Sequence, residues 1–245
     1  MKKFVLCLVL ASMTVALRSG YTQDKSLKKI RWGVTSLSAS QWIPWIAKDA
    51  KIYEKHGLDT ELILLRGSGR DVILITIGNT PERIQALVSG GVDAADLNYP
   101  ADAQAERLGF KVLWDAKQEV SYPSMSVVTR RKSVLEDRDT VMRMVKAHVE
   151  AIHYLKANKE FSLKVLSKYL KTNDRELLEG SYEIYRNDFI SVPYPITQGL
   201  QATYDYVALQ RPDVWKHKPE TFMDASFIAE LEKTGFIARL SERLR

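Results

Sequence analysis

"KIRWGVTSLSASQWIPWIAKDAKIYEKHGLDTELILL", residues 29–65, places two apolar runs on either side of a helical pattern. The first run, residues 29–34, is short and rich in β-branched and aromatic residues, which is typical of a buried strand. Apolar residues then recur at helical spacing over residues 42–53, and Gly57 supplies a C-cap. A second strand is expected over residues 60–65. The stretch therefore predicts a strand–helix–strand unit.

The same alternation continues along the chain. Further strands are expected over residues 71–78, 92–99, 110–115 and 125–131, and helices over 78–91 and 100–109. Beyond residue 138 the patterns predict helices almost to the end. One face of the first of these helices carries Val141, Met144, Val145, His148, Ile152 and Leu155. His148 is therefore expected to be a core histidine, and the whole order predicts an α/β protein with mostly parallel strands.

The N-terminus has the pattern of a secretory signal. Lys2 and Lys3 precede the apolar run "FVLCLVLASMTVAL", and small and polar residues follow. The run is too short to span a bilayer easily, although an uncleaved anchor is the alternative. We expect residues 1–24 to be a signal peptide cleaved near residues 19–24, and the mature protein to be exported to the periplasm.

Charge and cysteine content narrow the possible functions. Removing Lys2, Lys3 and Arg18 with the signal leaves 33 basic residues against 30 acidic ones, a net charge of +3. This mild excess indicates no nucleic-acid site and is compatible with weak attraction of anionic small molecules. Cys7 is the only cysteine and lies in the signal. The mature chain is thus expected to have no disulfide, thiolate metal site or cysteine nucleophile.

Catalytic motifs are hard to find in this sequence. The four histidines show no metal-ligand spacing, and there is no Gly-x-Ser-x-Gly nucleophile elbow. The Gly67-Ser68-Gly69 turn lacks the lysine of a phosphate-binding loop. Asp93 and Asp96 form a carboxylate pair of a kind that is common by chance. We therefore predict a protein that is not an enzyme, with no cofactor and no metal.

Binding residues are easier to identify than catalytic ones. In "TSLSASQW", residues 35–42, hydroxyls, an amide and backbone N–H groups precede a helix N-terminus, an arrangement that can hold an anion. An ordinary serine-rich N-cap loop explains the composition equally well. Trp42, Tyr99 and Tyr122 border expected strand ends and could wall a pocket, although each taken singly is more often a packing residue.

Four segments, in this order, resemble the solute-binding proteins of the nitrate/sulfonate/taurine ABC-transporter class. They are residues 30–65, "GNTPERIQALVSGGVDAADLNYPADAQAERLGFKVL", "VKAHVEAIHYLKANKEFSLKVLSKYLKTND" and "DASFIAELEKTGF". The resemblance covers nearly the whole mature chain. It implies a two-lobed, periplasmic-binding-protein-like architecture that closes on a small anionic or polar organic ligand and delivers it to a membrane permease. A monomer is expected.

The stretch around residues 66–72 departs from this family pattern. The chain passes from the second strand of the first lobe directly into what resembles a later strand of the second lobe. The phrase "SG-x-VDxA", expected once in each lobe, occurs only at residues 89–94. We therefore infer an internal deletion that leaves the second lobe truncated. Residues 25–70 and 124–245 would form lobe 1, and residues 71–123 lobe 2.

The resemblance also implies a set of ligand contacts. By position these are Ser38, Ser40, Gln41, Trp42, Ser68, Tyr99 and Tyr122. The serines and Gln41 would donate hydrogen bonds to the head group, and the aromatic rings would enclose an apolar portion.

Two alternatives remain at this point. The first is a remnant of such a receptor that transports nothing. The second is an enzyme like the related pyrimidine-precursor synthases, which resemble iron enzymes with clustered cysteine and histidine near the site; the absence of cysteine from the mature chain disfavours it.

Overall fold

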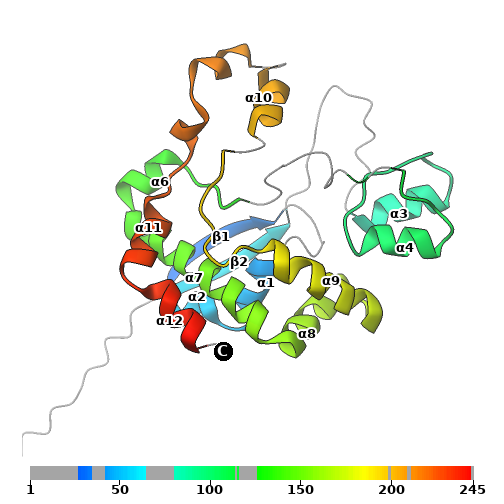
Figure 1. Ribbon diagram of the computed structural model, residues 1–245, viewed down its shortest axis with the longest axis horizontal. Helices are drawn as coiled ribbons and strands as arrows, with labels where there is room; N and C mark the ends of the chain where they lie inside the picture. Colours follow the sequence, from blue (N-terminus) through cyan, green and yellow to red (C-terminus); the bar gives the residue numbers. More distant parts are fainter. Residues whose placement is uncertain are drawn as a thin grey trace, which may run out of the picture.

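A small parallel sheet lies at the centre of the helical body in the computed structural model (Figure 1). The structure describes residues 27–34, 42–64, 80–113, 115, 126–197, 200–208 and 211–243. Strand β1 (Lys28–Val34) pairs in parallel with β2 (Leu58–Leu64), in a register that joins Lys28 to Leu58 and Val34 to Leu64. Both strands expected in the opening stretch are confirmed.

The two faces of this sheet differ because side chains alternate along a strand. Leu58 and Thr60 are buried on one face, where Ile30 and Trp32 also pack against the core. On the other face Lys29, Arg31, Asp59 and Glu61 are exposed. The register places Lys29 opposite Asp59 and Arg31 opposite Glu61, so opposite charges face each other across the strands.

The crossover between the strands is two helices and not the single helix expected. Helix α1 (Trp42–Asp49) ends, and α2 (Ile52–Lys55) begins after Lys51, whose φ of 55° lies in the left-handed region. A non-glycine residue with this φ interrupts the right-handed helix. The chain then turns into β2 through Gly57, whose φ is 73°. A glycine is suited to this position because it has no Cβ atom to oppose a positive φ.

Helix α7 (Arg138–Ala157) is buried on two sides and organises the rest of the fold. Met144, Ala147, Ala151 and Leu155 join the main core, formed with the sheet, α1, α2, α8 (Lys159–Leu170) and α9 (Arg175–Asp188). Met142 and Val149 instead pack against a second cluster on α11 (Ser226–Lys233) and α12 (Phe236–Arg243). The single apolar face expected on this helix is thus divided: Val141 and Val145 contact the second cluster.

Two smaller groups of helices project from this body (Figure 1). Helices α3 (Thr80–Val88) and α4 (Ala101–Arg107) bury Leu87, Ala101 and Ala105 and lie beyond α9. Helix α10 (Leu200–Ala208) is followed by the short helices η2 (Pro212–Lys216) and η3 (Pro219–Phe222). Arg131, on α6 (Arg131–Glu136), donates from Nη2 to the Thr221 carbonyl over 3.2 Å, which ties this group to the body.

Three expected strands are wrong where the structure describes them. Residues 92–98, 110–113 and 126–130 form no strand, and α6 begins at Arg131. A strand needs a neighbour for its backbone hydrogen bonds, and in the described chain only β1 and β2 form a ladder. The helices expected over 78–91, over 100–109 and beyond 138 are confirmed. The strand expected over 71–78 lies outside the described residues.

Candidate ligand-binding site

The carboxyl edge of the sheet is where ligands bind in α/β folds of this type. Val34 and Leu64 are register partners, so β1 and β2 end at the same edge. Residues 35–41 join the end of β1 to the start of α1, and residues 65–79 follow the end of β2. Ser38, Ser40, Gln41 and Ser68 belong to these two segments, which lie outside the described residues, and their roles stay predictions.

Trp42 is the predicted site residue at the first position of α1. Its side chain is fully buried, and its indole Nε1–H donates to the Ser162 carbonyl of α8 over 3.1 Å. The ring also meets Tyr182 of α9 edge-on, at 6.2 Å between ring centroids. Trp42 therefore anchors the start of α1 in the main core, next to the predicted ligand loop. Its part in walling a ligand stays a prediction.

Tyr99 lies just before α4 and contacts α9. The Tyr185 hydroxyl donates to the Tyr99 carbonyl over 3.3 Å, and the Tyr99 ring lies against Gly180. Burial, together with the nearby Asp102 carboxylate, raises the pKa of Tyr99. Tyr122, the remaining predicted contact, lies outside the described residues. The structure thus places Trp42 and Tyr99 against helices of the body, and a ligand contact by either one is untested.

A buried polar side chain, that of His148, lies against the sheet. His148 packs against Trp32, with ring centroids 4.5 Å apart, and meets Tyr53 edge-on at 5.8 Å. Its Nδ1 is 2.9 Å from the Met144 carbonyl, and burial lowers its pKa from 6.5 to about 4. His148 is therefore neutral at pH 7, and the expected core histidine is confirmed.

An ion cluster joins α2 to α7 on the same side of the molecule. Glu150 is buried, and its carboxylate lies 2.8 Å from His56 Nε2 and also pairs with Lys55. Burial acts to raise the pKa of Glu150, but hydrogen bonds from His56 and Lys55 outweigh it and lower that pKa. All three groups hold one another, so this cluster is a structural contact and not a reactive centre.

Within the ranges that the structure describes, no three His, Cys, Asp or Glu side chains gather as a metal site would require. In those ranges no helix combines the length and apolar character needed to cross a membrane.

The contact between α4 and α9 was not predicted from the sequence. Arg107 of α4 pairs with Asp174 and Glu176 at the start of α9, at 2.6 and 2.7 Å, beside the Tyr99–Gly180 contact. The available signal was Gly180 itself, because a glycine in the interior of a helix is less favourable than alanine and so draws attention to its surroundings.

The observations so far define an α/β protein with a parallel strand–helix–strand unit and a candidate binding edge at the carboxyl ends of its strands. The model of the NMT1-like family matches residues 12–167, which is more than half of the chain. The chain belongs to this family, which includes periplasmic binding proteins of the nitrate/sulfonate/taurine type. No curated protein and no solved structure gives a significant match.

Proposed function

We propose that this protein is the extracytoplasmic substrate-binding component of an ABC importer. It captures a small anionic or polar organic ligand, of the sulfonate, nitrate or taurine kind, and delivers it to a membrane permease. The observation that carries the proposal is the parallel β1–α1–α2–β2 unit, whose two strands end at one edge and which lies inside the family match. That edge is the usual position for a ligand in an open α/β sheet.

The binding groups follow from this position. The serines Ser38 and Ser40, with Gln41 and Ser68, donate hydrogen bonds to the head group, assisted by the free backbone N–H groups at the start of α1. Trp42 fixes that helix start, since its indole N–H already has a partner in Ser162. Trp42, Tyr99 and Tyr122 enclose the apolar part of the ligand.

The remaining parts of the proposal concern the whole protein. Residues 1–24 direct export and are removed, and the mature protein works in the periplasm as a monomer. Residues 25–70 and 124–245 act as one lobe and residues 71–123 as a second, truncated lobe. The protein performs no chemistry on its ligand.

A thermal melt of the mature protein tests the proposal. The ligands are taurine, alkanesulfonates, nitrate, phthalate-like acids and pyrimidines, each added separately. A ligand at about 100 times its Kd stabilises a protein by about 2.7 kcal/mol, which raises the midpoint of a chain of this size by several degrees. We expect an anionic ligand to produce this shift. Failure of every ligand to move a cooperative melt would contradict the proposal.

Two variants separate ligand contacts from packing. Gln41→Ala should abolish the ligand-induced shift and leave the ligand-free midpoint unchanged. Trp42→Phe should lower the ligand-free midpoint, because the buried indole hydrogen bond to Ser162 is lost. If the ligand raises the midpoint of Gln41→Ala as much as that of the parent protein, Gln41 is not a ligand contact.

The small sheet favours a second candidate, a receptor remnant that transports nothing. Within the described chain the sheet has two strands, and one face of this sheet is exposed. A cooperative melt that no ligand moves would support this candidate.

A further inference from the structure

Gly180 occupies an unfavourable position for a glycine, in the interior of α9. A glycine there destabilises a helix relative to alanine, because the unfolded chain has more freedom to lose. Leu177, Leu178, Ser181 and Tyr182 on either side of it are all buried, so this turn of α9 is well packed. A reason for the glycine must come from a group that approaches the helix backbone.

The Tyr99 ring is that group. A Cβ atom added to Gly180 would overlap the Tyr99 hydroxyl and lie 2.7 Å from Tyr99 Cζ, closer than a real Cβ approaches another heavy atom, and 3.2 Å from Tyr99 Cε1, a tight contact. The ring would therefore have to leave its position if residue 180 carried any side chain. The hydrogen bond from Tyr185, one turn further along α9, to the Tyr99 carbonyl holds the same segment of backbone.

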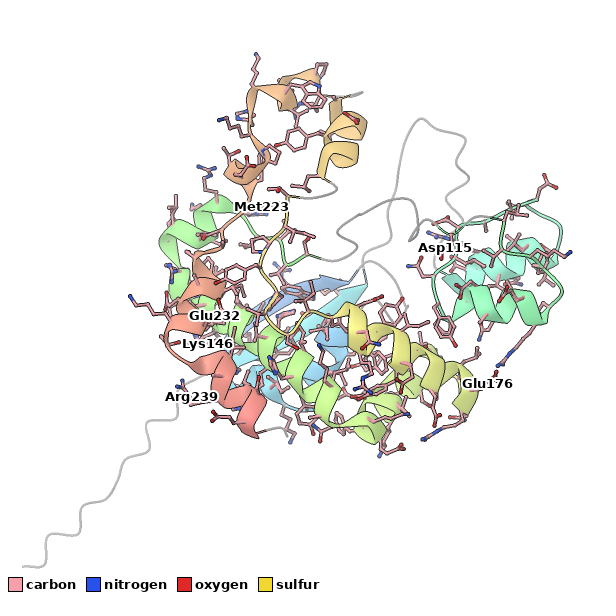
Figure 2. All side chains as sticks on the ribbon, in the orientation of Figure 1. Asp115, Lys146, Glu176, Met223, Glu232 and Arg239 are labelled. Atoms are coloured by element: carbon pink, nitrogen blue, oxygen red, sulfur yellow. The ribbon has the colours of Figure 1, made fainter. Side chains whose placement is uncertain are left out.

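A second contact lies at the beginning of α9. Arg107, the last residue of α4, reaches Asp174 with Nη1 at 2.6 Å and Glu176 with Nη2 at 2.7 Å. Glu176, labelled in Figure 2, lies on the part of α9 next to α4. Asp174 also caps α9, since its carboxylate accepts from the Leu177 N–H. These charges are largely exposed, so salt should weaken the pairs.

We propose that Tyr99 on Gly180, together with Arg107 on Asp174 and Glu176, forms a latch that fixes the position of the α3–α4 unit against α9. Tyr99 is then a positioning residue. The link to ligand binding rests on the proposed function, because the α3–α4 unit belongs to the segment that would form the second lobe. The latch itself needs no ligand and can be tested without one.

Distance measurements between spin labels test the latch in the full chain. Cys7 is the only cysteine, so a Cys7→Ser background allows labels at Gln85→Cys on α3 and Lys164→Cys on α8, both of which are exposed. The latched protein should give one narrow distance distribution. Gly180→Leu should shift and broaden it. Arg107→Ala should broaden it at low salt, and 1 M salt should broaden the parent distribution toward that of Arg107→Ala, because salt screens the same ion pairs. A Gly180→Leu distribution identical to the parent's would overturn the proposal.

Matched controls identify effects that do not come from the latch. Arg175→Ala removes a pair with Glu160 that joins α9 to α8 and a pair with Glu179 within α9, and neither pair involves α4. Gly91→Ala adds a methyl group whose nearest neighbour is 3.4 Å away, an ordinary contact. Both should leave the distances unchanged, and equal broadening in them would overturn the proposal. Gly180→Ala should have two opposite effects. The helix content measured by circular dichroism should rise, because alanine favours α9, while the distances shift, because the new Cβ displaces the Tyr99 ring.

A ligand titration separates this proposal from the proposed function. Taurine or whichever probe shifts the melt should bind Gly180→Leu with an altered Kd, whereas Gln41→Ala should not bind it. If no probe binds the parent protein, the proposed function fails while the distances still decide the latch. If the distances shift in Gly180→Leu but the Kd does not, the link between latch and site is overturned.

Discussion

His148 shows how one buried side chain can set the pH range in which this protein is stable. It is 7% exposed and packs against the rings of Trp32 and Tyr53. Burial favours its neutral form, and the hydrogen bond to the Met144 carbonyl opposes this only partly. The folded state therefore binds a proton at His148 much less readily than the unfolded chain does.

This difference predicts acid sensitivity. The pKa of His148 is about 4 in the folded state and about 6.5 in the unfolded chain, so the unfolded state binds more protons between these values. The stabilisation is complete above pH 6.5 and is lost as the pH falls toward 4. Between pH 7.5 and pH 5 we expect the free energy of unfolding to drop by about 2 kcal/mol, as measured by urea titration.

The same titration on two variants assigns the effect. His148→Phe keeps a ring against Trp32 but cannot be protonated, so most of the drop should disappear. His217→Gln, at an exposed position, should keep it. His153, whose pKa burial also lowers, accounts for a residual slope of the same sign. A drop of full size in His148→Phe would show that other groups cause the acid sensitivity.

Sequence reasoning could assign His148 but could not decide the role of Trp42. The helical spacing that places His148 on an apolar face is local information, and burial follows from it. Trp42 stands at the junction of a polar loop and a helix, so its sequence context fits both a pocket wall and a core anchor. The contact that anchors it, with Ser162, joins residues 120 positions apart, and no local pattern encodes such a contact.

At the scale of elements, the turn from α2 into β2 depends on a backbone conformation. Gly57 has a φ of 73°, its carbonyl accepts from the Lys28 N–H over 2.9 Å, and Arg143 Nη1 donates to the same carbonyl over 3.3 Å. This one residue therefore joins α2, the start of β1 and α7. Sequence reasoning predicted the glycine as a C-cap, and the structure confirms a left-handed residue there.

Replacing Gly57 by alanine should destabilise the protein by about 1–2 kcal/mol, the cost of a left-handed conformation for a residue with a Cβ. The new Cβ would also lie 3.1 Å from Arg143 Nη1, which has to move. Lys51→Gly is the matched variant, because Lys51 already has a φ of 55°. Urea unfolding should show a loss for Gly57→Ala and none for Lys51→Gly; equal stability of Gly57→Ala and the parent would contradict the role assigned to this turn.

The strands that sequence reasoning placed wrongly have a common physical cause. Residues 92–99, 110–115 and 125–131 contain β-branched and aromatic residues, which favour a pleated, half-buried surface. That preference is realised only if a neighbouring strand lies alongside. Val127 and Val128 are 47% and 81% exposed. Pairing is a long-range property, so composition could not reveal its absence here.

At the scale of the whole molecule, stability is distributed unevenly. The main core gathers residues from both strands and from α1, α2, α7, α8 and α9, and it includes the fully buried Trp42, Trp45 and Tyr53. The buried apolar side chains of the α3–α4 unit in the described chain are those of Leu87, Pro100, Ala101 and Ala105, and the unit meets α9 through the latch. The family match spans both parts, but the small unit has far less apolar surface to hold it folded.

This imbalance predicts two levels of opening in native-state hydrogen exchange. Amides of α3 and α4 should exchange through a local opening of low free energy that low denaturant hardly changes. Helix α7 contributes to both cores and α8 to the main core. Their amides should therefore exchange only through global unfolding, with a steep denaturant dependence. Gly180→Leu should lower the protection of α3 and α4 further and leave α7 unchanged, since the latch contributes nothing to the packing of α7. Exchange of all four helices with one free energy and one denaturant slope would show instead that the small unit and the body unfold as a single cooperative structure.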